Sequence, residues 1–170
     1  MASASASGGM KCFTDSTRVV KNFVPGIIGG ELVQYTCGNK FISGLGNTAN
    51  EAGSSVAKFA ELSAIWGISC SISPSDIAFY QGRYLARYSC GSQIVSAGNT
   101  FQDVSDIAYE LGLIASKSGR FCQTSMNLIN ASGSGVQVRY NCGNTQVIGT
   151  GYSVKVASLD AVSKMKALWP

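Results

Sequence analysis

Six cysteines are the residues of this chain whose type and spacing could do chemistry. Three stand in a repeated Tyr-x-Cys-Gly tetrapeptide, in copies 53 and 52 residues apart: Cys37, Cys90 and Cys142. Each is preceded, by 25, 20 and 20 residues, by one further cysteine: Cys12, Cys70 and Cys122. A fixed period of about fifty residues is typical of stacked repeats that share one core. We therefore predict one domain over 11–170, made of three tandem repeats at about 11–69, 70–121 and 122–170.

Three interpretations of these cysteines stay open on the sequence alone. An even number permits a disulfide framework, and the repeat symmetry favours one bond within each unit: Cys12–Cys37, Cys70–Cys90 and Cys122–Cys142. Such a framework indicates an oxidising compartment. Alternatively, a thiol on a flexible segment of small residues could attach a cofactor covalently through a thioether, at any of the six positions. The third interpretation is a set of buried free thiols that pack as small hydrophobic side chains.

A thioether-linked, extended tetrapyrrole would also need polar partners close to its cysteine. Its propionates would bind arginine, and Arg87 and Arg139 each lie three residues before a tetrapeptide cysteine. Its pyrrole N–H groups would bind a carboxylate, for which Asp76 and Asp103 are local candidates. Aromatic side chains could form the walls of such a site, and three of them are predicted to contact the chromophore: Tyr84, Tyr88 and Tyr140.

Catalytic and metal chemistry have little support in the composition. The chain contains no histidine, which removes the commonest general base and the commonest metal ligand. It has no Cys-x-x-Cys pair of the kind that anchors zinc sites, and its nine Asp and Glu residues are scattered. The thirteen Lys and Arg residues are also dispersed, whereas nucleic-acid binding clusters positive charge. We therefore predict that the protein is not an enzyme, has no metal site and binds no nucleic acid.

The elements that position the cysteines are predicted from periodicity and turn residues. A loop rich in Gly, Ser and Asn follows each tetrapeptide, and helical periodicity follows each loop. Two loops end in Gly-Asn-Thr, whose Asn or Thr would cap the helix, and Ser153 is the expected cap in the third unit. Between the cysteines, 73–76 predicts a helix start that 77–88 continues, whereas 31–36 and 136–140 alternate like strands. We predict a mainly α fold; the alternative is α+β, with short strands at the Tyr-x-Cys-Gly segments.

The ends and the overall charge add three further expectations. Residues 1–10 are of low complexity and are predicted to form a flexible tail, or the edge of an organelle-targeting region. No apolar run is long enough to span a bilayer, so we expect a soluble protein with no direct membrane insertion. A net charge of +4 is compatible with a partner that is acidic overall.

The recurring Tyr-x-Cys-Gly, the Gly-rich loops, the Ala-rich helices, the basic balance and the absence of histidine resemble the gamma-type subunits of red-algal phycoerythrin. These are coloured rod linkers of the phycobilisome. The resemblance covers most of residues 11–169 and is one of pattern. It implies a mainly helical repeat protein that sits inside acidic phycobiliprotein alpha/beta hexamers, contacts other linkers and transfers excitation energy.

The resemblance also implies the cofactor and the compartment. The cofactor would be a phycobilin, phycourobilin or phycoerythrobilin, linked by thioether to Cys37, Cys90 and Cys142, with the three upstream cysteines as alternative or second sites. Light harvesting for photosynthesis would place the protein in the chloroplast, on the stromal side of the thylakoid. Two alternatives stay open. One is a secreted, disulfide-stapled repeat domain that binds a protein or a carbohydrate. The other is a small colourless assembly protein of the same light-harvesting system.

Overall fold

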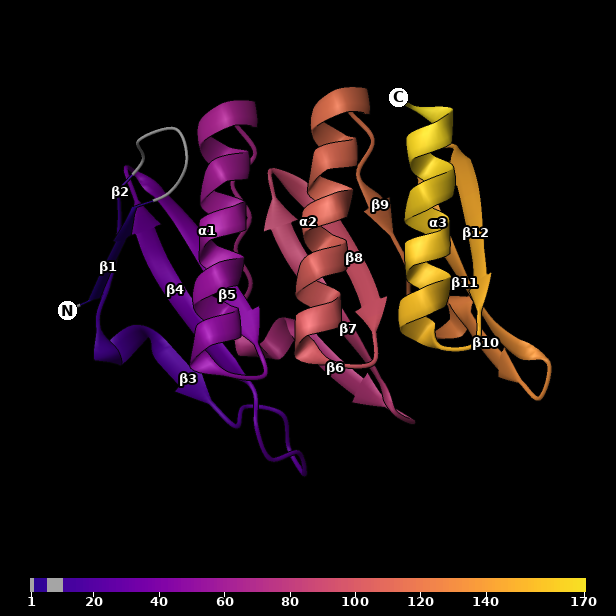
Figure 1. The fold of residues 1–170 in the computed structure, drawn as a ribbon, viewed down its shortest axis with the longest axis horizontal. Coiled ribbons are helices and arrows are strands. Elements are labelled where there is room, and N and C mark those ends of the chain that lie inside the picture. Colours follow the sequence, from indigo (N-terminus) through magenta and orange to yellow (C-terminus); the bar gives the residue numbers. More distant parts are fainter. Residues whose placement is uncertain (1, 6–10) are drawn as a thin grey trace.

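The structure, a computed structural model, describes residues 2–5 and 11–170, and in it three successive units repeat one arrangement of strands followed by a helix (Figure 1). The first unit contains β2 (Lys11–Thr14), η2 (Ser16–Arg18), β3 (Val19–Lys21), β4 (Glu31–Cys37), β5 (Lys40–Gly46) and α1 (Ala49–Trp66). The second contains η3 (Pro74–Asp76), β6 (Ile77–Tyr80), β7 (Arg83–Cys90), β8 (Ser92–Gly98) and α2 (Phe101–Ser118). The third contains β9 (Cys122–Gln123), η4 (Met126–Leu128), β10 (Ile129–Ser132), β11 (Gly135–Cys142), β12 (Thr145–Gly151) and α3 (Val154–Leu168).

The strands form two sheets, and the three helices lie side by side on one face of them (Figure 1). The first sheet has the order β1-β2-β4-β3, with β5 on the free side of β4. The second runs β10-β11-β9-β8-β7-β6, with β12 on β11. Strand β1 (Ala2–Ser5), from the expected tail, pairs antiparallel with β2. The rest of that tail, 1 and 6–10, lies outside the described residues.

The mainly α prediction is wrong, because two multi-stranded sheets accompany the three helices. The alternative, α+β with strands at the Tyr-x-Cys-Gly segments, is confirmed by β4, β7 and β11. The helix expected over 73–88 was the main error. Pro74 and the Ser73–Asp76 capping box do start a helix, but only the single 3-10 turn η3. The chain then forms a hairpin, since Gln81 and Gly82 have φ angles of 49° and 78°, which suit a tight turn between strands.

The helices begin as the turn residues predict. The side chains of Thr48, Thr100 and Ser153 each accept the backbone N–H three residues on. Each helix packs closely on the last strand of its own unit. At Gly44 an added Cβ would lie 2.2 Å from the carbonyl oxygen of Ala52, so only glycine allows this approach of α1 to β5.

Consecutive units are joined through backbone pairing, side-chain caps and a shared core. Strand β9 of the third unit pairs parallel with β8 of the second, and the Ser43 N–H donates to the Cys70 carbonyl at the preceding junction. Asn47 accepts a hydrogen bond from the Phe101 N–H at 3.2 Å, so each Gly-Asn-Thr asparagine caps the helix of the next unit. One cluster of buried hydrophobic side chains runs through all three units.

Candidate functional site

All six cysteines form disulfides, one bond in each unit: Cys12–Cys37, Cys70–Cys90 and Cys122–Cys142. The pairing predicted from repeat symmetry is therefore confirmed, and the interpretation as free thiols is wrong. Each bond ties the N-terminal segment of a unit to its tetrapeptide strand. In the chain-entropy model, a loop of this size stabilises the fold by about 3 kcal/mol.

A thioether at any of these cysteines would require its disulfide to be opened first, because both bonds use the same sulfur atom. The cysteines are also buried, with at most 4% of the residue surface exposed. Attachment of a phycobilin at Cys37, Cys90, Cys142 or an upstream cysteine thus stays a prediction, and it depends on reduction of the protein.

The tyrosine of the tetrapeptide lies at a junction between units. The Tyr140 hydroxyl donates to Ser158 of α3 at 3.0 Å and accepts from the Ala97 N–H of the preceding unit at 3.1 Å. Burial raises its pKa to about 12. Tyr88 is equally buried, and its ring stacks on Phe59 of the preceding helix with centroids 5.3 Å apart. These two tyrosines therefore hold successive units together and have no exposed surface to offer a chromophore.

The remaining predicted contact residues lie in three separate places. Tyr84 packs in the core between Phe79 and Phe101, with ring centroids 4.8 and 4.4 Å away. Asp103 is buried at the start of α2, where its carboxylate accepts the N–H groups of Asn99 and Thr100. Asp76 accepts the Ser73 hydroxyl in the 3-10 turn η3 and lines one small cavity together with Arg87. The structure therefore gives both carboxylates a capping role and does not bring them together with the tyrosines in one cavity.

Arg87 and Arg139 occupy equivalent positions on the face of the sheet that points away from the helices. Along β7 the side chains of Tyr84, Ala86 and Tyr88 are buried, so Arg83 and Arg87, which alternate with them, point to the other side. The same alternation along β11 places Arg139 opposite to Tyr140. We call this side, formed by the strand residues that alternate with the buried ones, the outer sheet face.

Charge is divided between the helices and the rest of the chain. The helices carry five lysines and six carboxylates, so the remaining residues account for a net charge of +5. All five arginines lie outside the three α-helices: Arg18, Arg83, Arg87, Arg120 and Arg139. The ion pairs within the described residues all use lysine, so no arginine there has a carboxylate partner.

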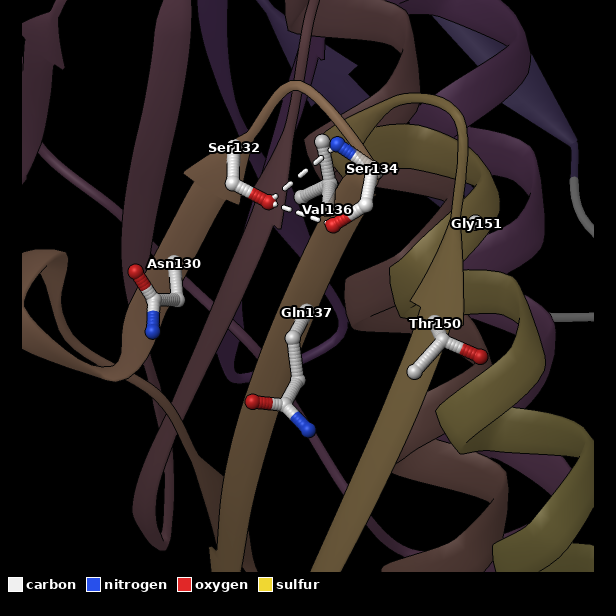
Figure 2. A pocket seen from close by; sticks show the side chains of 8 residues that line it. Asn130, Ser132, Ser134, Val136, Gln137, Thr150 and Gly151 are labelled. Carbon is white, nitrogen blue, oxygen red and sulfur yellow. Dashed lines mark hydrogen bonds between the residues drawn. The ribbon is translucent and has the colours of Figure 1, made fainter.

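A shallow polar cavity of about 500 Å³ opens beside the hairpin of β10 and β11 (Figure 2). Asn130, Gln137 and Thr150 stand next to one another on three adjacent strands, and Ser132 and Ser134 bond to each other at the hairpin tip (Figure 2). All of these side chains are uncharged hydrogen-bonding groups. Within the described part of the chain, no group of three Asp, Glu, His or Cys residues could hold a metal ion.

These features define a class of protein: an α+β repeat domain with one buried disulfide per unit and a basic outer sheet face. No protein-family model and no curated protein matches the chain. None of the helices in the described residues is long and apolar enough to cross a membrane.

Four residues that the sequence analysis did not single out lie at positions that differ among the three units. Phe13 and Phe41 are exposed on the outer sheet face of the first unit, and Asp160 and Lys164 contact the last strand from α3. Aligning the three units on Tyr-x-Cys-Gly would have revealed both pairs, because each replaces residues of a different character in the other units.

Proposed function

We propose that this chain is a non-enzymatic binding module, held together by its three disulfides, that recognises an acidic protein through the arginines of its outer sheet face. The observation that carries the proposal is the set of five arginines, all outside the three α-helices and all without a carboxylate partner among the described residues. Three of them, Arg83, Arg87 and Arg139, lie on the outer sheet face. Arginine binds carboxylates in a two-point geometry and is enriched in interface hot spots. Arginines left unpaired on an open face suit recognition of carboxylates on another molecule.

Two of these arginines are the best anchors. Arg87 and Arg139 stand at the same position of consecutive units, directly before the tetrapeptide tyrosine. Both extend from rigid strands, which lowers the cost of ordering them on binding. The equivalent residue of the first unit is Gln34, so the fold accepts an uncharged side chain there.

The resemblance to phycoerythrin gamma-type subunits supplies the first partner to test, the acidic phycobiliprotein alpha/beta hexamer. Three buried disulfides favour an oxidising compartment, as expected for the secreted alternative; the chloroplast follows only from the resemblance. A covalently bound phycobilin is a separate proposal. Visible absorbance that stays with the chain after denaturation would support it, and three disulfides with a colourless chain in non-reducing mass mapping would contradict it.

The experiment that tests acidic recognition is a double substitution, Arg87→Gln with Arg139→Gln. Binding to immobilised phycobiliprotein hexamers and to a Glu-only dodecapeptide should weaken about tenfold, because two carboxylate contacts are lost. Binding of the unaltered protein should also fall as salt rises. The matched control removes two positive charges from the helices, Lys58→Gln with Lys117→Gln, and should change affinity less than twofold. Equal losses in the two variants would show that net charge alone is sensed and would overturn the proposal.

A further inference from the structure

The first unit differs from the others in one row of side chains on the outer sheet face. Phe13, Thr36 and Phe41 are direct neighbours across β2, β4 and β5. Phe13 and Phe41 are 45% and 56% exposed, whereas the hydrophobic residues that alternate with them on these strands belong to the buried core. Two large apolar side chains in one exposed row are therefore free to contact another molecule.

Comparison with the other units shows that the fold does not need phenylalanine at these positions. The equivalent row is Ser71, Ser89 and Gln93 in the second unit. In the third unit it is Gln123, Asn141 and Gln146. Polar side chains fill the row in two of three copies of the same backbone, so the phenylalanine pair serves something other than the packing of its own unit.

Positive charge surrounds the pair. Arg18 donates a hydrogen bond to the Thr36 hydroxyl, so its guanidinium lies beside the residue that separates the two phenylalanines in the row. Lys40 directly precedes Phe41 on β5. A small cavity of about 120 Å³ is lined by Phe13, Arg18 and Thr36, together with Asp15. The Asp15 carboxylate already accepts the Thr17 N–H and hydroxyl, which lowers its pKa and engages it within the chain. The Arg18 guanidinium thus supplies the positive charge of this cavity, beside the exposed Asp15 carboxylate.

We propose that this row, Phe13–Thr36–Phe41 with Arg18, is the apolar anchor for the acidic partner: it takes an apolar side chain of the partner against the exposed rings and an adjacent carboxylate on Arg18. The inference rests on the proposed function, whose arginines Arg87 and Arg139 lie on the same face in the next two units. An aromatic pair with an arginine is the composition of a binding hot spot, and the surrounding cations select an acidic segment.

The test compares two dodecapeptides with equal charge, one of Glu and Ser and one of Glu and Leu, by calorimetry at low salt. The unaltered protein should bind the Leu-containing peptide about tenfold more tightly, because only that peptide buries apolar surface on the rings. The variant Phe13→Ser with Phe41→Gln carries the residues of the second unit, so it should fold. It should bind both peptides equally, at the affinity of the Ser-containing one.

Controls separate this inference from the proposed function. Trp66→Gln removes an aromatic side chain of similar exposure at the end of α1 and should leave the preference for leucine unchanged. A preference that survives in the phenylalanine variant, or is absent in the unaltered protein, overturns the anchor while acidic binding through Arg87 and Arg139 stands. If neither peptide binds the unaltered protein, the proposed function itself fails.

Discussion

The outer sheet face of the third unit carries polar side chains in a row that is apolar in the first two units. One row across three strands shows the difference. It is Val20, Leu32 and Leu45 in the first unit and Ala78, Leu85 and Ala97 in the second. In the third it is Asn130, Gln137 and Thr150, the residues of the polar cavity in Figure 2. Leu45 and Ala97 have no exposed surface, whereas Thr150 is exposed. The cavity thus forms where the other two units have apolar side chains.

The helices repeat this contrast. Phe59 and Leu111, at equivalent positions of α1 and α2, are buried, and Phe59 stacks on the tyrosine of the next unit. The equivalent residue of α3 is Lys164, which donates to the Ile148 carbonyl at 2.8 Å. In the second unit the corresponding carbonyl, Val95, accepts instead from Thr124 of the next unit. A side chain of α3 therefore donates to the carbonyl that, in the second unit, accepts from the next unit.

Asp160 completes this replacement. Its carboxylate accepts the Thr150 N–H at 2.9 Å and pairs with Lys164 at 3.1 Å. In the second unit the equivalent N–H, that of Ala97, donates to Tyr140 of the next unit. An open strand edge invites pairing with another chain, and charged side chains that engage its backbone groups block this. The third unit therefore has the charged, backbone-engaging side chains that are typical of a capping unit in repeat proteins.

One pair of positions in the first unit is also charged where the second unit is apolar. Phe79 and Tyr84 form an aromatic pair in the second unit, where Tyr84 also packs on Phe101 of α2. Their equivalents in the first unit are Lys21 and Glu31, which form an ion pair with 3.6 Å between Nζ and Oε1. The first unit thus has an ion pair at positions where the second unit has an aromatic pair.

The largest effect on stability is expected when the lysine of α3 is substituted at the equivalent buried position of α2. Leu111→Lys puts the charge of Lys164 into a fully buried site. It should lower the free energy of unfolding by about 3–5 kcal/mol, because the leucine contacts are lost and the ammonium is desolvated without a partner. Guanidinium unfolding with the disulfides intact measures this.

The reciprocal variant is the control. Lys164→Leu loses one exposed ion pair and one hydrogen bond, so it should cost about 1 kcal/mol or less. Similar losses for the two variants would contradict the distinction between junction and cap.

The repeat period, the disulfide pairing and the three helix starts were predictable from the sequence, because each depends on local signals that recur. The strands of the second unit were not, since Ser73-Pro74-Ser75-Asp76 is a true helix start and nothing local shows that one turn follows it. The alternation around Tyr35 and Tyr140 indicated strands in the first and third units. Because repeats share one fold, this pattern outweighs the helix start at 73–76 and predicts strands over 77–88 as well. The predicted chromophore contacts were chosen by residue type. Arg87 and Tyr88 are consecutive residues of a strand, so they point to opposite faces of the sheet, and residue type alone does not reveal this.

A smaller effect is expected at the tyrosine hydroxyls, again with a contrast between positions. Tyr140→Phe removes the acceptor of the Ala97 N–H and leaves that buried group unpaired, which should cost about 1–3 kcal/mol. Tyr35→Phe should cost about 0.5 kcal/mol or less, because Tyr35 is only half-buried and its unit has Gly53 in place of Ser158. Thermal unfolding of the two variants under the same conditions compares them. A loss at Tyr35 as large as that at Tyr140 would show that the hydroxyl serves its own unit and not the junction.

The smallest effect concerns the cap itself and depends on pH. Hydrogen bonds from the Thr150 N–H and Lys164 hold the pKa of Asp160 below its ordinary value of 3.8. A carboxyl whose pKa is lower in the folded state stabilises the fold above the unfolded pKa, and this contribution disappears as pH falls through the folded pKa. Asp160→Asn should therefore melt below the unaltered protein at pH 7, with the difference shrinking as pH falls below 3.8.

The Asp160→Asn variant also leaves the edge of β12 less protected, so it should self-associate at high concentration in light scattering at pH 7. Glu61→Gln on the exposed side of α1 is the control for loss of one negative charge. If Glu61→Gln self-associates to the same degree, net charge alone keeps the copies apart and Asp160 does not act as a cap.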